Sequence, residues 1–581
     1  MTNWDERTDL LVVGSGAAGM TAALTAKLEG LESIVLEKCE YYGGSTAISG
    51  GGIWVPNNHL MAEAGVEDSI ENARLYMNNT VGARTPRANQ EAFLTRAPEM
   101  LQYLSRLPHM QFRIMRGFSD YYPERPGGMD EGRGIDTPIF RGRRLGRLFH
   151  QLRPHPIKTP FDLVFSTVEI KKIFLLAAHP PYLVDAFKVL ARNLYNKVFG
   201  VRHAGSGAAL IARLRISLRE QGVPVWLNTP VKEIVFDNGS AIGVEVEKEG
   251  KRLRIRATKG VVLAAGGFPH NQAMREKYQK HPVNTRWTVA SPGNTGEVIE
   301  MGINAGAAVD LMDDNWGMPT VLPPDKSTFP LVMERSYPGA IMVNAAGRRF
   351  TNEAAPYLDV VHAMYEEDSE GCVSIPSFWI MDKRFHNRYF LAGHIPGILP
   401  SKHLETGYII KADTIAELAE KTGIDPSVLV DTVKGFNDFA RSGKDPDFKR
   451  GDSAYDRFYS DPSVKPNPCL APIEKSPFLA VKVFPGDIGT KGGLLTNENA
   501  QVLDKNGAII EGLYAAGNTS ASVMGNTYPG PGSTLGPAMT FGYIAAMHAA
   551  GRSKGGGTTT SGLLGHRSSK FLRGTPCDAT R

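Results

Sequence analysis

The most informative part of the sequence is residues 9–38, DLLVVGSGAAGMTAALTAKLEGLESIVLEK. A short apolar run at residues 10–13 leads into a glycine-rich turn. Alanine and leucine then recur at helical spacing through residues 20–28, and residues 33–36 form a second apolar run. The order strand, turn, helix, strand predicts a βαβ unit, which implies a parallel sheet with helices on its faces.

The turn carries the pattern G-x-G-x-x-G at Gly14, Gly16 and Gly19, with Ala18 inside it. The first glycine permits the tight turn, the second lets the main chain approach a pyrophosphate, and the third allows close helix packing. The positive end of the following helix attracts phosphate. Glu37, at the end of the second strand, is placed to accept hydrogen bonds from a ribose. The unit is therefore predicted to bind a dinucleotide.

A second glycine-rich stretch, YYGGSTAISGGGIWVPNN, follows at residues 41–58. It combines five glycines with several small hydroxyl side chains, which fits a chain running closely along an extended cofactor. An NAD dehydrogenase would more often enter its next helix here. The stretch therefore favours FAD as the cofactor.

Strands are expected near both ends of the chain, with a region of different character between them. Residues 231–268 contain alternating strands around an Asn-Gly turn, and residues 509–518 form a short apolar strand. Between about 312 and 487, proline-rich and aromatic segments alternate with helical patterns. We expect an α/β chain in which a Rossmann-like FAD-binding domain carries an inserted α+β catalytic, or capping, domain. The expected bounds are 1–313 and 488–552 for the first domain, 314–487 for the second, and 553–581 for a disordered polar tail.

The composition of the 581 residues is that of a globular protein, with 42% hydrophobic and 22% charged residues. The net charge of +5 is too small to indicate a nucleic-acid partner. The four cysteines show no C-x-x-C spacing, so neither a disulfide framework nor a zinc site is expected. The polar N-terminus and the lack of a long apolar run predict a cytoplasmic protein without a membrane span.

An unusual segment, residues 140–200, lies inside the first domain. Residues 159–200 mix large apolar side chains with lysines and arginines, and a run of arginines precedes them. Two interpretations are open: a helical excursion that covers the core, or a basic amphipathic surface that docks on anionic lipid. The second would make the protein a peripheral membrane protein. The basic residues are Arg141, Arg143, Arg144, Arg147, Lys171, Lys172, Lys188, Arg192 and Lys197.

These features together resemble the flavoproteins of the fumarate reductase and 3-ketosteroid dehydrogenase superfamily. The G-S-G-A-A-G turn, the pattern G-G-S-T-A-x-S-G-G-G, and the later stretches GVVLAAGGF and GLYAAGN carry the resemblance, which extends over nearly all of the chain except the tail. It implies FAD, which we expect to be non-covalent because no histidine attachment motif is evident. The residues expected to bind FAD are Gly14, Gly16, Ala18, Gly19, Glu37, Lys38, Gly43, Gly44, Ser45, Thr46, Ser49, Gly50, Gly51, Gly266, Gly517, Asn518, Ser533 and Leu535.

Within this superfamily the sequence looks like the 3-ketosteroid Δ1-dehydrogenases. Their T-Y-P-G-x-G pattern falls on residues 527–532, and SDYYPERPGG (119–128), RRFTNEAAPY (348–357) and DIGTKGGLLT (487–496) are similar to further family stretches in the same order. The resemblance implies FAD-dependent 1,2-dehydrogenation of 3-ketosteroids in steroid or sterol degradation. The carboxylate clamp motif that dicarboxylate reductases need is not found.

The resemblance also assigns four catalytic residues. The Tyr528 hydroxyl and the Gly532 N–H, at the start of the following helix, polarise the C3 carbonyl. Tyr357 takes the C2 proton, and Tyr121 forms a hydrogen bond to Tyr357 from behind. The adjacent Tyr122 is the alternative to Tyr121 in this supporting role. Because the usual tyrosine pKa is near 10, the base needs this hydrogen bond and a positive potential nearby. The C1 hydrogen leaves as a hydride to the flavin N5, and no metal is required.

The expected partners are a 3-ketosteroid or 3-ketosterol, an external electron acceptor (a quinone or a protein) and a membrane surface. Other readings of the function stay open. They are a 3-ketosteroid Δ4-(5α)-dehydrogenase, against which the Tyr-Pro-Gly-x-Gly stretch argues, a dicarboxylate or enoate reductase, and a non-catalytic flavin-binding protein.

Overall fold

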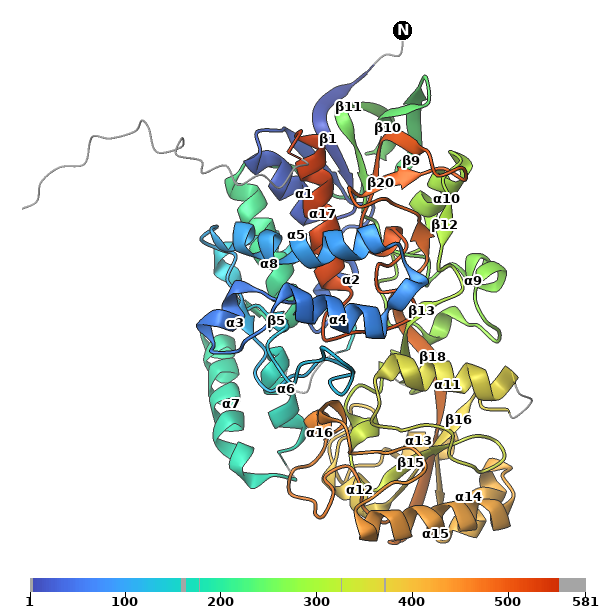
Figure 1. Cartoon of the computed structure of the whole chain (residues 1–581). Coiled ribbons are helices and arrows are strands. Elements are labelled where there is room, and N and C mark those ends of the chain that lie inside the picture. Colours follow the sequence, from blue (N-terminus) through green and yellow to red (C-terminus); the bar gives the residue numbers. More distant parts are fainter. Residues whose placement is uncertain (1–3, 158–162, 177, 325–326, 370–372, 553–581) are drawn as a thin grey trace, which may run out of the picture.

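The computed structural model describes residues 4–157, 163–176, 178–324, 327–369 and 373–552. Figure 1 shows two parts, one above the other. The upper part contains β1, β11 and α17, and so brings together the first and the last described elements of the chain. The lower part contains the yellow and orange segments around β15 and β16. The predicted tail, 553–581, lies outside the described residues.

The upper part is built on a sheet with the strand order β20-β21-β11-β1-β2-β8. The pairs β21–β11, β11–β1, β1–β2 and β2–β8 are parallel, whereas β20 and the extension formed by β10 and β9 are antiparallel. The strands are β1 (Glu6–Val13), β2 (Ser33–Leu36), β8 (Val225–Trp226), β9 (Val231–Asp237), β10 (Ser240–Lys248), β11 (Lys251–Leu263), β20 (Gln501–Leu503) and β21 (Ile509–Ala515).

The predicted βαβ unit is confirmed. Leu10 and Val12 of β1 share one hydrophobic core with α1 (Ala17–Leu28), α8 (Ser206–Glu220) and α17 (Leu535–Ala549). Leu11 and Val13 point the other way, into a second core with α10 (Glu297–Asn304). Successive side chains of a strand face opposite sides of the sheet, so burial on both sides explains the unbroken apolar run of this parallel strand.

Further helices and short strands complete the upper part. They are α2 (Gly44–Ala47), β3 (Ile53–Trp54), α3 (His59–Glu63), α4 (Ile70–Thr80), α5 (Arg87–Ser105), β4 (Arg113–Ile114), β5 (Gly134–Asp136), β6 (Phe140–Arg141), β7 (His203–Ala204), α9 (Gln272–Tyr278), β12 (Val309–Asp310) and β19 (Gly493–Leu494). β3, β5 and β4 form a small antiparallel sheet. It lies beside the Tyr528 segment, because the Gly532 carbonyl accepts a hydrogen bond from the Trp54 N–H.

The lower part has its own antiparallel sheet, with the order β14-β13-β18-β16-β15 and with β17 also paired to β18. Its elements are β13 (Asn315–Val321), β14 (Phe329–Pro330), β15 (Ala340–Val343), α11 (Tyr357–Ser369), β16 (Ser377–Asp382), α12 (Lys383–Arg388), α13 (Ser401–Glu405), β17 (Ile409–Ala412), α14 (Ile415–Thr422), α15 (Pro426–Ser442), α16 (Ala454–Tyr459) and β18 (Phe478–Thr490). Strand β18 runs across the predicted boundary at 487/488, and the exact domain bounds stay a prediction.

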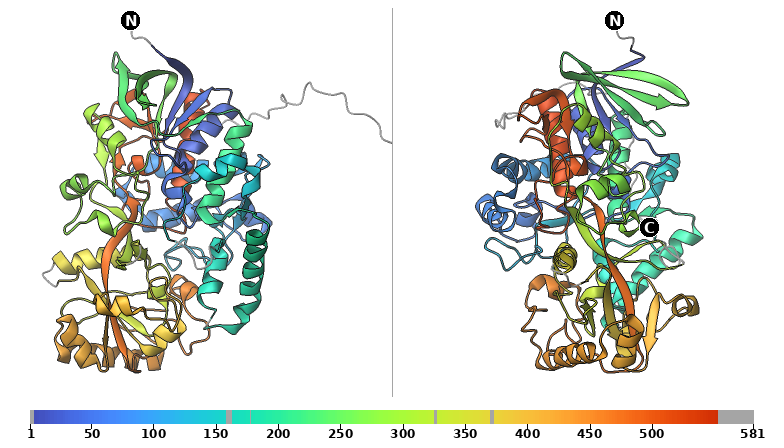
Figure 2. Two further views of the ribbon diagram at one scale, coloured as in Figure 1. Left: turned by 180° about the vertical axis from the view of Figure 1, so that it is seen from behind. Right: turned by 90° about the vertical axis from the view of Figure 1, so that its right-hand side faces the viewer.

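The excursion between β6 and β7 contains helices joined by irregular segments. It contains α6 (Thr167–Phe174) and α7 (Leu183–Val198), and α7 lies along the edge of the molecule in Figure 2. Within the described residues, no helix combines the length and the hydropathy that crossing a membrane demands.

Candidate functional site

A cavity of about 1230 Å³ extends from the glycine-rich turn after β1 to the second sheet. The four predicted catalytic residues, Tyr121, Tyr357, Tyr528 and Gly532, all line it. So do all of the predicted cofactor-binding residues except three. Residues that lie far apart in the sequence are therefore brought to one site.

The three exceptions are Gly19, Gly43 and Ser533. They lie behind the cavity wall, where they pack against or hydrogen-bond to neighbouring residues. A Cβ atom on Gly19 would lie 2.0 Å from the Gly14 oxygen, so this glycine allows the first turn of α1 to pack on the strand. The Gly43 N–H donates to Ser15 Oγ. Ser533 Oγ is buried and exchanges hydrogen bonds with the Gly530 N–H and carbonyl. This hydroxyl closes a turn, and the assignment of Ser533 to FAD binding stays a prediction.

The glycine-rich end of the cavity fits the FAD that the sequence predicts. Gly14 has a φ of +108°, and a Cβ atom there would lie 2.3 Å from the Ala264 oxygen, so only glycine fits. At Gly16, by contrast, the closest atom to an added Cβ is Thr46 Oγ1 at 3.7 Å, which leaves the main chain open to a ligand. The N-terminus of α1 also faces this space and would attract a pyrophosphate.

Glu37 lies at the same end of the cavity and is almost buried. Its carboxylate accepts hydrogen bonds from the N–H and hydroxyl of Ser15 and from the Cys39 N–H. These bonds orient the carboxylate in a wall of the cavity, where it can accept a hydrogen bond from a ribose. Lys38 is engaged elsewhere, since its ammonium donates to Thr295 and Glu297 at 2.6 Å.

Three tyrosines meet at the other end of the cavity. The Tyr121 and Tyr357 hydroxyl oxygens lie 2.9 Å apart. The Tyr528 ring stacks on Tyr121 at 4.9 Å between ring centroids and meets Tyr357 edge to face at 5.0 Å. Each of the three side chains is at most 5% exposed. Tyr122, in contrast, donates its hydroxyl proton to Asp359 at 2.8 Å and does not line the cavity. This geometry favours Tyr121 over Tyr122 as the partner of Tyr357.

Burial controls the acidity of these phenols. It raises the pKa of Tyr357 well above the usual range, and the neighbouring Tyr121 and Tyr528 raise it further. Burial also raises the pKa of Tyr121 and of Tyr528; for Tyr528 the hydroxyl groups of Tyr357 and Thr534 oppose this effect. Tyr357 thus needs a source of positive potential to act as a base.

The loop of Tyr528 is braced on both sides of the tyrosine. The Lys491 ammonium donates to the carbonyls of Thr527 at 2.6 Å and of Gly525 at 2.8 Å. The Pro529 carbonyl accepts from the Tyr121 N–H and from the Tyr76 hydroxyl. Burial lowers the pKa of Lys491 to about 8. The sequence stretch 487–496 pointed to this region, but no role was predicted for its lysine.

Gly532 occupies a position that only glycine can fill. Its φ is +96°, and a Cβ atom would lie 2.3 Å from the carbonyl carbon and oxygen of Gly52. Helix α17 begins at Leu535, so Gly532 precedes the helix by three residues rather than standing at its start. Within the described part of the chain, no acceptor is found for the Gly532 N–H.

The wall around the tyrosines is largely apolar. It includes Met115, Phe118, Met318, Phe329, Val332 and Met333. Helix α6 of the excursion contributes Ile170 and Phe174 to the same wall. The sequence analysis missed these residues, because they come from separate segments and share no local motif.

Comparisons with known proteins show which family the chain belongs to. The model of the FAD binding domain family matches residues 9–535. The 3-oxosteroid 1-dehydrogenase of Mycobacterium tuberculosis is 47% identical over 93% of this chain and 98% of the relative. The 4-oxocyclohexanecarboxylate 2-dehydrogenase of Sinomonas cyclohexanicum is 33% identical over 94% of this chain and 93% of its own length.

A solved structure of the same family is also similar to this chain. The crystal structure of the 3-ketosteroid Δ1-dehydrogenase from Sterolibacterium denitrificans in complex with 1,4-androstadiene-3,17-dione superposes with a TM-score of 0.89 and 38% sequence identity. The match covers 94% of this chain and 100% of that chain.

Proposed function

Because the chain belongs to the FAD-dependent 3-oxosteroid 1-dehydrogenase family, we propose that it converts 3-oxo-4-ene steroids to 1,4-dienes. The observation that carries this proposal is the group of three buried tyrosines on a wide apolar cavity that ends at the dinucleotide motif. A flat, apolar ligand with one ketone suits such a cavity, because the wall excludes water and only a few polar groups are left to orient it.

The electrophilic half of the site consists of Tyr528 and Gly532. Tyr528 and Gly532 both line the cavity, where the Tyr528 hydroxyl and the Gly532 N–H, for which the described residues provide no acceptor, can donate to one carbonyl oxygen. Donors held at the C3 oxygen stabilise the negative charge that develops when C2 loses a proton. The bonds from Lys491 and Tyr76 to the flanking carbonyls hold the loop, so the donors need no reorganisation during the reaction.

The basic half consists of Tyr357 and Tyr121. Tyr357 takes the C2 proton, and the Tyr121 hydroxyl, 2.9 Å away, donates a hydrogen bond that stabilises the phenolate. Bound FAD would supply the acceptor for the hydride that leaves C1. Residues of the glycine-rich turn and Glu37 would hold this cofactor, without a covalent bond, and an external quinone or protein would reoxidise it.

The relatives differ in substrate size, so the test must compare ligands. Anaerobic addition of androst-4-ene-3,17-dione to the FAD-loaded protein should bleach the flavin absorbance. 4-Oxocyclohexanecarboxylate and succinate should not, because the tyrosine end of the cavity offers apolar surface rather than a clamp for a carboxylate. Bleaching by either acid, without bleaching by the steroid, would refute the proposal.

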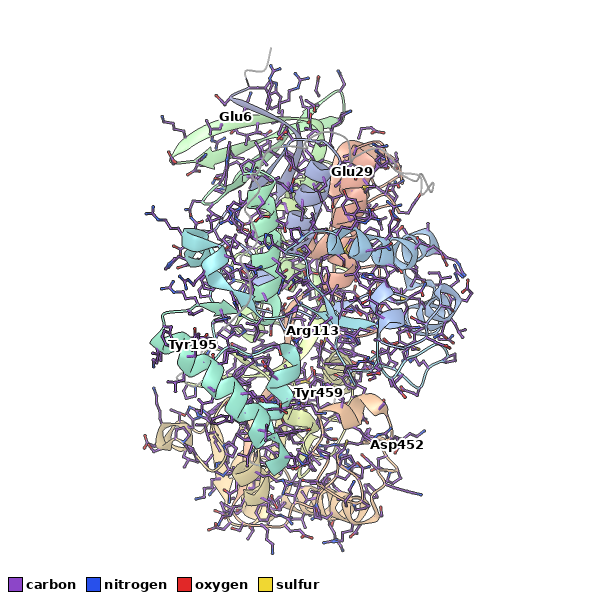
Figure 3. All side chains as sticks on the ribbon, turned by 90° about the vertical axis from the view of Figure 1, so that its left-hand side faces the viewer. Glu6, Glu29, Arg113, Tyr195, Asp452 and Tyr459 are labelled. Atoms are coloured by element: carbon purple, nitrogen blue, oxygen red, sulfur yellow. The ribbon has the colours of Figure 1, made fainter. Side chains whose placement is uncertain are left out.

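We also propose that the excursion docks on an anionic membrane surface. Helix α7 exposes one apolar face, on which Leu183, Phe187, Leu190, Leu194 and Val198 are each between 52% and 71% exposed. Figure 3 shows the labelled Tyr195 of the same helix at the edge of the molecule, away from the labelled Tyr459 near the cavity. These side chains recur every three or four residues, which is the pattern of a helix that lies in a bilayer interface.

Charge around this face favours anionic lipid. Lys188 and Lys197 of α7 are exposed, as are Arg143 and Arg144 at the start of the excursion. Because α6 of the same excursion lines the cavity, a docked protein could take up sterols directly from the lipid phase.

Liposome flotation tests the docking. The triple variant Phe187→Asp, Leu190→Asp, Leu194→Asp should bind vesicles containing phosphatidylglycerol at least about 100-fold more weakly, since each buried apolar side chain contributes roughly 1.5–3 kcal/mol. Leu75→Asp on α4, where the leucine is 46% exposed, is the matched control. Equal flotation of the triple variant and the wild type would refute docking.

A further inference from the structure

A buried arginine, Arg335, lies next to the proposed catalytic base. Its side chain is fully buried, and the centre of its guanidinium lies 5.9 Å from the centroid of the Tyr357 ring. No resemblance or local motif pointed to this residue. It follows β14 in the sequence, in the short helical turn Glu334–Ser336.

The guanidinium is held only by neutral groups. In the described part of the chain its hydrogen bonds go to the carbonyls of Leu331, Glu353 and Ala355, the last two just ahead of Tyr357. No carboxylate lies within ion-pair distance there, and one nitrogen, Nη2, has no partner. The charge is therefore not neutralised by a direct contact.

Arg450 provides a contrast in the same cluster. It is equally buried and also donates to main-chain carbonyls, but its guanidinium pairs with the Glu353 carboxylate at 2.9 Å. A buried charge without such a partner destabilises the fold unless another group offsets it. A phenolate beside Arg335 would be that group.

On the basis of the proposed function, we propose that Arg335 is a positioning residue for Tyr357. It fixes the chain ahead of the tyrosine through Glu353 and Ala355, and its unpaired positive charge favours the phenolate form that removes the C2 proton. It does not touch the substrate in this role; it acts through Tyr357.

The electrostatic effect is large enough to matter. The 5.9 Å separation is measured to the centre of the Tyr357 ring, and a unit charge about 6 Å from a phenolate shifts its pKa by about two units at an effective dielectric constant of about 20. The same arginine opposes the effect of burial on the neighbouring Tyr455 and Tyr459, whose pKa values burial raises. The proposal thus accounts for how a phenol whose pKa is raised by burial can work as a base.

Other titratable groups face the same region, and the test must distinguish their titration from that of Tyr357. They are the carboxyl groups of Glu334, Asp359 and Asp456 and the phenols of Tyr455 and Tyr459. Glu334 is the most important of these, because burial raises its pKa to about 7, within the range in which activity would be measured.

The test is the pH dependence of kcat for the FAD-loaded enzyme with androst-4-ene-3,17-dione and an artificial electron acceptor. In Arg335→Gln the midpoint of the rising limb should move up by about two units, so that kcat below the midpoint falls about 100-fold. Arg335→Lys keeps the charge and loses the forked hydrogen bonds, so its midpoint should stay within about half a unit of the wild type. Arg335→Met, of similar volume, replaces the glutamine variant if that does not fold.

Two controls separate charge from structure. The double variant Arg450→Gln, Glu353→Gln removes a buried guanidinium from the same cluster without changing the net charge, and should lower the melting temperature but leave the midpoint in place. Glu334→Gln should also leave it in place. The inference is overturned if the midpoint is unchanged in both the glutamine and the methionine variant of Arg335. It is also overturned if the midpoint moves as far in the double variant as in the Arg335 variant. If the wild type does not oxidise the steroid at all, the proposed function fails instead.

Discussion

Tyr121→Phe removes a hydroxyl that lies 2.9 Å from the Tyr357 hydroxyl. A hydrogen bond to a charged group contributes about 1.5–3 kcal/mol. Because the bond from Tyr121 strengthens as Tyr357 becomes a phenolate, this energy is lost mainly from the transition state for C2 deprotonation. The expected fall in kcat is therefore about 10-fold to 150-fold, with steroid binding little changed because the ring and its stacking on Tyr528 remain.

Tyr122→Phe is the matched control, since it removes a hydroxyl from the adjacent residue. That hydroxyl donates to Asp359, which is part-buried, so its loss leaves a part-buried acceptor without this donor. The expected result is a loss of about 1–3 kcal/mol of stability with a nearly unchanged kcat. The pair of variants should thus separate a defect in rate from a defect in stability.

The assay combines anaerobic stopped-flow flavin reduction at saturating androst-4-ene-3,17-dione with thermal unfolding of the same FAD-loaded samples. Steroid affinity is read from the perturbation of the flavin spectrum by the 1,4-diene product. If Tyr122→Phe slows flavin reduction as much as Tyr121→Phe does, or if Tyr121→Phe reduces the flavin at the wild-type rate, the proposed support of Tyr357 by Tyr121 is wrong.

Three further variants probe the same site. Tyr357→Phe should retain steroid binding but lose at least about 100-fold in kcat, the contribution of a general base; wild-type turnover would remove Tyr357 from that role. Tyr528→Phe should slow the exchange of the C2 hydrogen with deuterated water, measured by mass spectrometry of recovered steroid, and an unchanged exchange rate would contradict its part in polarising the ketone. Gly532→Ala should abolish turnover and weaken product binding, because its Cβ would meet the main chain of Gly52 at 2.3 Å; crystals showing an undisturbed loop would contradict this.

Local patterns were sufficient for the dinucleotide end of the site. Gly14 has a positive φ, and a Cβ atom at Gly19 would collide with the Gly14 carbonyl oxygen. Both constraints arise within one turn and the helix that follows it. The bonding of the Ser533 hydroxyl to Gly530 could not be predicted in the same way, because competition between possible partners is not visible in a residue pattern.

The sequence by itself determined the βαβ unit and the FAD motif, because these depend on neighbouring residues. Stretches that resemble a family were enough to predict Tyr357, Tyr528 and Gly532 as catalytic residues. Only the tertiary structure decided between Tyr121 and Tyr122, since adjacent side chains point in different directions and Tyr357 lies 236 residues from Tyr121 along the chain. It also revealed Arg335. The effect of a buried charge depends on which groups surround it, and packing of distant segments sets those surroundings.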